Sequence, residues 1–106
     1  MDKCDRESFD RVEVLDTGEL LVGLAGAGNP SYQHVYRAAA GVYWEPKMRG
    51  FKSTPMREWS ALRCFSHIVS VVRSEIGVEL VPAEVISWRS LSEIDKGEIQ
   101  QAALRK

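Results

Sequence analysis

The sequence predicts an α+β fold in which an antiparallel sheet packs against one long central helix, with a short helix at the C-terminus. Helix start and stop signals enclose a periodic apolar segment over residues 55–76. Segments with strand-like alternation precede and follow it, over residues 11–24 and 78–88. The chain has 106 residues, of which 44% are hydrophobic, so we expect residues 1–106 to form a single domain with its own core.

The first predicted element is a β-hairpin. Val12 and Val14 share one face of a strand, and apolar residues alternate again over residues 20–24. Gly18, between the two segments, provides the positive φ that a tight hairpin turn needs. The charged residues before the hairpin offer little apolar surface, so we expect residues 1–10 to be mobile.

The middle of the chain predicts short elements. Residues 30–40 have apolar side chains at helical spacing and favour a helix, but alternation within them keeps a strand open as the alternative. Residues 41–45 are rich in strand formers and end at Pro46. Residues 47–52 then predict a turn with a short return strand.

The long helix has its signals in the correct order. Thr54 suits the N-cap, Pro55 the first helical position, and Gly77 the left-handed residue that ends a helix. An apolar stripe runs along the helix and is expected to face the core. It contains Leu62, Phe65, Val69, Val72 and Ile76, with Ala61 and Ile68 beside it.

The C-terminal part predicts two strands and a helix. The strands lie on either side of Pro82-Ala83, and the proline indicates that one of them is an edge strand. The helix is predicted over residues 92–104, with Asp95 and Glu98 as its capping box.

The polar face of the long helix is the first candidate binding surface. Trp59 projects about 110° from the centre of the apolar stripe. At that angle its indole does not point toward the core that the stripe is expected to face. It shares that face with Arg63, Ser66 and Ser70, and Trp and Arg are common anchors of interfaces. Two alternatives remain open: a loop around Phe51 covers the indole, or the serines form an ordinary solvated face.

The basic, aromatic middle segment is the second candidate surface. Residues 33–63 hold six bases and two acids, and Arg49 and Phe51 lie among them. Residues 2–19 hold seven acids and three bases, so the two segments either steer a charged partner or neutralise each other. Single-stranded nucleic acid sites also mix aromatic and basic residues. The net charge of −1 makes nucleic acid unlikely, and a protein partner is the better interpretation.

Catalytic and metal-binding patterns are sparse. Cys64 and His67 lie one turn apart, but no third group orients them, so an enzyme is the less favoured interpretation. A pocket near His34 or His67, with Tyr36 and Trp44 as further lining candidates, is kept as the alternative for a small ligand. The two cysteines lack paired-ligand spacing, and we expect no metal, cofactor or membrane partner and a cytoplasmic location.

The aromatic layout carries a resemblance to a known group of proteins. It extends over residues 30–44 and continues at Phe51, Trp59, Phe65 and Trp88. In size and layout the chain resembles the small orphan proteins of integron-type mobile bacterial gene cassettes, and it is similar in style to toxin-immunity proteins. The resemblance implies a compact cytoplasmic α+β protein, often a dimer or a binder of another protein, with no catalytic residues to carry over.

These observations favour a non-catalytic protein that works by protein–protein binding. The partner is expected to be a second copy of the chain or a target of the immunity or adaptor type. A small-ligand-binding protein or an enzyme remains the alternative.

Overall fold

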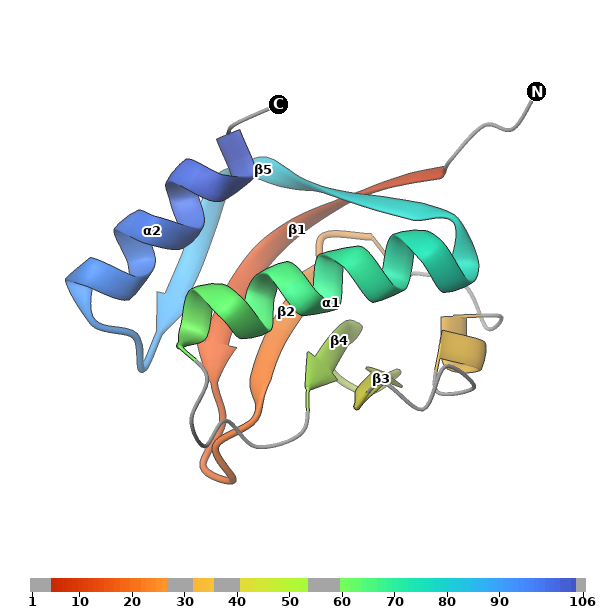
Figure 1. Cartoon of the computed structure of the whole chain (residues 1–106), viewed down its shortest axis with the longest axis horizontal. Coiled ribbons are helices and arrows are strands. Elements are labelled where there is room, and N and C mark those ends of the chain that lie inside the picture. Colours follow the sequence, from red (N-terminus) through yellow and green to blue (C-terminus); the bar gives the residue numbers. More distant parts are fainter. Residues whose placement is uncertain (1–4, 27–31, 36–40, 54–59, 105–106) are drawn as a thin grey trace.

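The structure of the chain is a computed structural model that describes residues 5–26, 32–35, 41–53 and 60–104. Within them, five strands form one sheet in the order β3-β4-β2-β1-β5, and two helices lie on one face of it (Figure 1). The elements follow the chain as β1 (Asp5–Val14), β2 (Leu20–Leu24), β3 (Val42–Glu45), β4 (Gly50–Ser53), α1 (Ala61–Ile76), β5 (Val78–Arg89) and α2 (Glu93–Leu104). The α+β class predicted from the sequence is confirmed.

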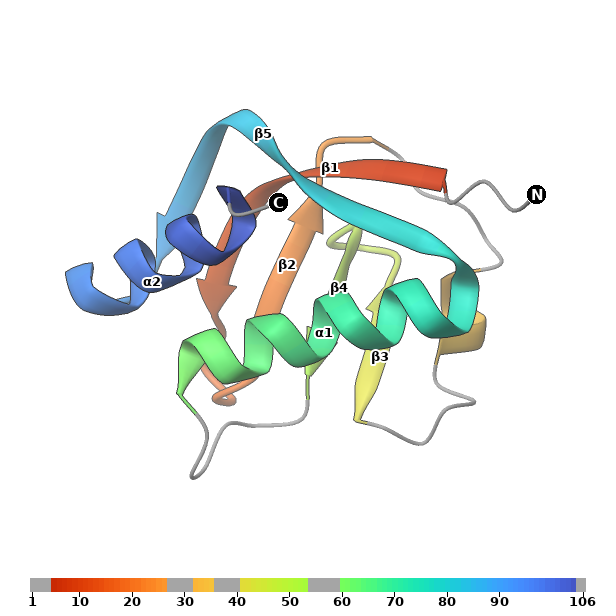
Figure 2. The same cartoon turned by 45° about the horizontal axis from the view of Figure 1, so that its top comes forward.

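The sheet is mixed, whereas the sequence predicted an antiparallel one. β1, β2, β4 and β3 pair antiparallel, but β5 pairs parallel to β1. The reason is the connection: β4 runs in the direction of β1, and α1 carries the chain back across the sheet before β5 begins (Figure 2). Parallel strands need such a crossover, which is usually a helix.

The N-terminal hairpin is confirmed. Its turn is closed by the amide of Leu15, which donates to the Glu19 carbonyl at 2.8 Å, and Gly18 adopts a φ of 91°. β1 begins at Asp5, so residues 5–10, which we expected to be mobile, form its first half. The strand is therefore longer than the apolar alternation alone indicated.

The core lies between the sheet and the helices. Its side chains from the hairpin include Phe9, Val12 and Val22, all fully buried. Phe9 meets Phe65 of α1 edge to face, with 5.5 Å between the ring centres. This contact joins the middle of β1 to the first half of α1.

A second aromatic cluster lies at the edge of the sheet formed by β3 and β4. Phe51 on β4 packs against Trp44 on β3 and Tyr32, with ring centres 4.9 and 5.7 Å apart. The Tyr32 hydroxyl donates to the Glu7 carboxylate at 2.5 Å, which ties this cluster to β1. The strands predicted at 41–45 and 47–52 are present as β3 and β4. Of the helix or strand expected over 30–40, the described residues 32–35 form one 3₁₀ turn.

α1 is shorter than predicted because it begins after a different cap. Ser60 has extended backbone angles, and its hydroxyl accepts the amide of Arg63 at 3.1 Å, so the helix starts at Ala61 rather than Pro55. Residues 54–59, including the predicted cap Thr54, lie outside the described residues. The predicted end is confirmed, since Gly77 is left-handed with a φ of 65°.

The buried face of α1 is rotated from the predicted stripe by about 70° at 100° per residue. Cys64 and Val71 are buried, whereas Leu62, Val69 and Ile76 are only half-buried at the edge of the core. Cys64 faces the sheet, where its side chain makes a hydrogen bond with Ser53 at the end of β4.

β5 is one bent strand rather than the two predicted around Pro82. Its pairing with β1 shifts register: β1 advances from Phe9 to Arg11 while β5 advances from Pro82 to Ser87. The extra residues of β5 therefore bulge at the bend seen in Figures 1 and 2. α2 follows where predicted, but its cap is Ser92, whose hydroxyl accepts the Asp95 amide at 3.1 Å, instead of the predicted capping box.

Arg11 crosses the sheet on the face opposite the helices. Its guanidinium donates to the carbonyls of Met48 at 2.7 Å and Leu24 at 3.3 Å, which links β1 to the β3–β4 turn across β2. Gly23 leaves the space for it, because a Cβ there would lie 2.6 Å from Arg11 Cζ. The arginine and the glycine therefore depend on each other.

We predict that Gly23→Ala destabilises the protein by about 1–2 kcal/mol, because the guanidinium must leave hydrogen bonds of the charge-assisted kind. In an Arg11→Ala background, Gly23→Ala should lower the free energy of unfolding by at least about 1 kcal/mol less than it does in the native chain. Urea unfolding of the native chain, the two single variants and the double variant measures this coupling. Additive effects would show that Arg11 does not occupy the space above Gly23.

Candidate functional site

The structure separates the residues proposed for the two binding surfaces. Arg63, Ser66 and Ser70 are exposed on α1, whereas Arg49 lies in the turn between β3 and β4 with a positive φ of 51°. Phe51 is fully buried and belongs to the core. Trp59, the central residue of the expected surface, lies outside the described residues.

The residues proposed for a ligand pocket come from several elements. His67 is half-buried on α1 and His34 is exposed in the 3₁₀ turn, so the two come from separate elements. Trp44 is half-buried because it packs on Tyr32 and Phe51. Tyr36 lies outside the described residues.

The thiol of Cys64 is held in its neutral form. Burial raises its pKa above the ordinary value of 9.0, and this outweighs the hydrogen bond with Ser53 and the charge of Arg63, which both lower it. A protonated, buried thiol is a poor nucleophile. Cys64 therefore packs in the core on the buried face of α1.

Charges from the acidic and basic segments meet on the sheet. The Lys52 ammonium lies 3.8 Å from the Glu19 carboxylate and 3.4 Å from that of Glu45. This contact joins the N-terminal acidic segment to the basic middle one. It supports mutual neutralisation in the fold for these side chains.

Within the part of the chain that the structure describes, no group of three or more His, Cys, Asp or Glu residues is placed to hold a metal ion. Of the helices described, neither α1 nor α2 has the length and apolar character needed to cross a bilayer.

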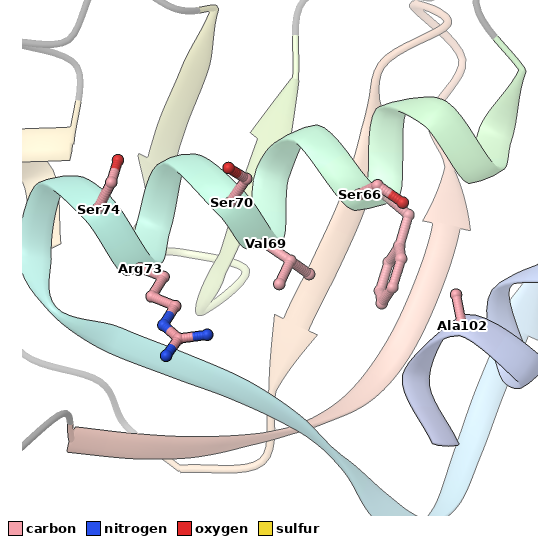
Figure 3. A pocket seen from close by; sticks show the side chains of 7 residues that line it. Ser66, Val69, Ser70, Arg73, Ser74 and Ala102 are labelled. Atoms are coloured by element: carbon pink, nitrogen blue, oxygen red, sulfur yellow. The ribbon is translucent and has the colours of Figure 1, made fainter. Parts of the chain in front are cut away.

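Two hollows flank α2. The first, which we call the α1 groove, has a volume of about 590 Å³ and runs along the flank of α1 toward the last turns of α2 (Figure 3). It is lined by Phe65, Ser66, Val69, Ser70, Arg73, Ser74 and Ala102. Ser66 and Ser70, two of the predicted surface residues, are thus brought together at its edge.

The second hollow, which we call the β5 groove, lies between the bend of β5 and α2 and has a volume of about 680 Å³. It is lined by Pro82, Ala83, Glu84, Val85, Ile86, Trp88, Lys96, Gln100 and Ala103. Val85, in the bulged segment of β5, is 80% exposed. Ile94 lies on α2, two residues before Lys96, and is 75% exposed.

These exposed apolar side chains were not among the residues predicted for a site. The alternation over residues 84–88 indicated an ordinary strand, in which Val85 would be one of many half-buried residues. The signal that marks it is the proline before it, which interrupts the strand and permits the bulge. The size of the bulge depends on how β5 pairs with β1, and this pairing cannot be predicted from the alternation of apolar residues.

Comparison with known proteins agrees with the resemblance found in the sequence. A solved structure described as an integron cassette protein, Hfx_Cass5, from the mobile metagenome of the North West Arm sewage outfall is similar to this chain. The identity is 28%, 97% of each chain is covered, and the TM-score is 0.40. No family model matches the chain, and no curated protein matches it.

The buried thiol predicts an alkaline loss of stability. Because the folded pKa of Cys64 is raised, its contribution is fully present below the unfolded value of 9.0 and is lost as the pH rises toward the folded value. Between about pH 8 and pH 10, the free energy of unfolding should fall more for the native chain than for Cys64→Ala. Equal slopes in urea unfolding would contradict a protonated thiol in the core.

Proposed function

We propose that the protein is a non-catalytic cytoplasmic protein that acts by protein–protein binding, and that its partner is a second copy of itself. The observation that carries the proposal is Val85, a large apolar side chain 80% exposed at the edge of the β5 groove. Val85 adjoins the apolar residues Pro82, Ala83 and Trp88 of the groove, and contiguous exposed apolar surface is typical of interaction sites. A reduced, unpaired thiol at Cys64 fits a cytoplasmic location.

The β5 groove has the composition of an interface centre. Trp88 is a residue type enriched among hot spots, and Pro82, Ala83 and Ala103 add apolar surface around it. Glu84, Lys96 and Gln100 give the groove polar residues of both signs. An apolar centre with a polar surround is the usual arrangement in protein–protein interfaces.

A second copy suits this surface because it offers both a projection and a hollow. In a two-fold symmetric dimer the same patch faces itself, so Val85 of each copy can enter the hollow of the other. Every contact then occurs twice, which doubles the effect of one substitution on association. The bulge also keeps the outer edge of β5 from presenting a regular strand, so side-chain packing is favoured over strand addition.

The exposed polar face of α1 supports a protein interface less well. Arg63, Ser66 and Ser70 are exposed there, and none is a large apolar side chain. Interfaces of marginal size need buried apolar anchors to offset the entropy of association. A target of the immunity or adaptor type would be expected to use the β5 groove for the same reason.

We predict that the native chain, of 11.9 kDa, has the mass of a dimer in light scattering, whereas Val85→Asp has the mass of a monomer. A carboxylate at the interface centre would be buried twice without a partner. Because Val85 is exposed, the substitution should change the stability of the monomer by less than about 0.5 kcal/mol, which circular dichroism during heating can check.

Tyr43→Asp is the matched control, since Tyr43 is also exposed but lies on β3 at the opposite edge of the sheet. It should leave the mass of the dimer unchanged. A monomeric native chain at the highest soluble concentration, or a dimeric Val85→Asp protein, would overturn self-association through the β5 groove.

A further inference from the structure

The α1 groove has one continuous helical face as its wall. Ser66, Val69, Ser70 and Arg73 line it at positions i, i+3, i+4 and i+7 of α1, within one broad arc of the helix. Figure 3 shows Val69 and Arg73 projecting from α1 on the side of β5, with Ala102 of α2 at the far end of the groove. The groove is therefore elongated, with Arg73 toward one end and Ala102 at the other.

The charge of the groove is positive and unopposed. Arg73 is the only charged residue among those that line it, and its guanidinium makes no ion pair or hydrogen bond with the described residues. The nearby strand β5 carries Glu79, but its carboxylate lies 3.5 Å from the guanidinium of Arg6. The amide of Gly77 bonds to the carbonyls of Val72 and Arg73, so these acceptors are already occupied at this end of α1.

The groove also combines donors with an apolar surface. The hydroxyls of Ser66 and Ser70 make no hydrogen bond within the described part of the chain, whereas that of Ser74 donates to the Val71 carbonyl at 3.4 Å. Phe65 is buried and Val69 half-buried, and both lie between Arg73 and Ala102 along the groove. A ligand here would meet a guanidinium at one end and carbon along its length.

We propose that the α1 groove binds a small organic anion, with a carboxylate or sulfonate head and an apolar body. The head would accept the two parallel N–H groups of the Arg73 guanidinium, which projects toward β5 (Figure 3). The body would lie over Val69 and Phe65 toward Ala102. From Arg73 back to Ser66 the helix rises about 10 Å, which suits one or two rings or a short aliphatic chain.

This ligand site is independent of the proposed dimer. The two grooves use different sides of α2: Ala102 lines the α1 groove, and Ala103 lines the β5 groove. Binding of the anion can therefore be tested in the Val85→Asp protein as well as in the native chain. Loss of one property does not require loss of the other.

The probe for the test is 8-anilinonaphthalene-1-sulfonate, which carries a sulfonate on an aromatic body and fluoresces when transferred from water. We expect saturable binding to the native protein and a rise of about tenfold or more in the dissociation constant for Arg73→Gln, because a charge-assisted pair is lost. Arg73→Lys keeps the charge but not the planar fork, so an intermediate affinity is expected.

Arg63→Gln is the matched control, since it removes the same charge from an exposed position of the same helix outside the groove lining. It should leave the dissociation constant within about twofold. The neutral analogue N-phenyl-1-naphthylamine should bind more weakly and should not respond to Arg73→Gln. Thermal unfolding of each variant verifies that it is folded.

The proposal is overturned if Arg73→Gln binds the sulfonate as the native protein does, or if Arg63→Gln loses affinity equally. It is also overturned if the neutral analogue binds as tightly as the anion, since the groove would then act as an apolar surface only. Binding that needs Arg73 but tolerates the loss of Arg63 supports it.

Discussion

The parallel pairing of β5 with β1 is the constraint on which the rest of the structure depends. It places β5 beside the N-terminal strand, so the chain must cross the sheet after β4, and α1 is the crossover. Gly77 makes the reversal immediate, since β5 begins at the next residue. The crossing lays Phe65 on Phe9 and so builds the centre of the core.

The same pairing generates both grooves. β5 is longer than its partner segment of β1 between Phe9 and Arg11, and the surplus becomes the bulge that exposes Val85. The strand beyond the bend carries α2 back to the sheet, where Ile99 joins the core. α2 thus lies between α1 and β5, with one groove on each side. The α1 groove has Arg73 as its only charged lining residue, whereas the β5 groove has the exposed apolar side chain of Val85 at its edge.

Much of the fold can be predicted from local pattern. The hairpin, β3, β4, the end of α1 and the position of α2 follow from alternation, turn residues and a left-handed glycine. The start of α1 could not be settled this way, because Thr54 and Ser60 are both good caps and the choice depends on tertiary packing.

Strand direction and register join residues far apart in sequence, so neither the parallel β5 nor the exposure of Val85 could be predicted. Ser66 and Ser70 were recognised as exposed from helical periodicity, but Arg73 and Ala102 line one groove only through the packing of α2 on α1.

The central claim is that a second copy docks through the β5 groove. Intermolecular nuclear Overhauser effects in a mixture of isotope-labelled and unlabelled chains test it most directly. The account predicts contacts between the Val85 methyl groups of one chain and the Trp88 indole of the other, because projection and hollow exchange places across a two-fold axis. Intermolecular contacts confined to the polar face of α1, or none at all, would contradict it.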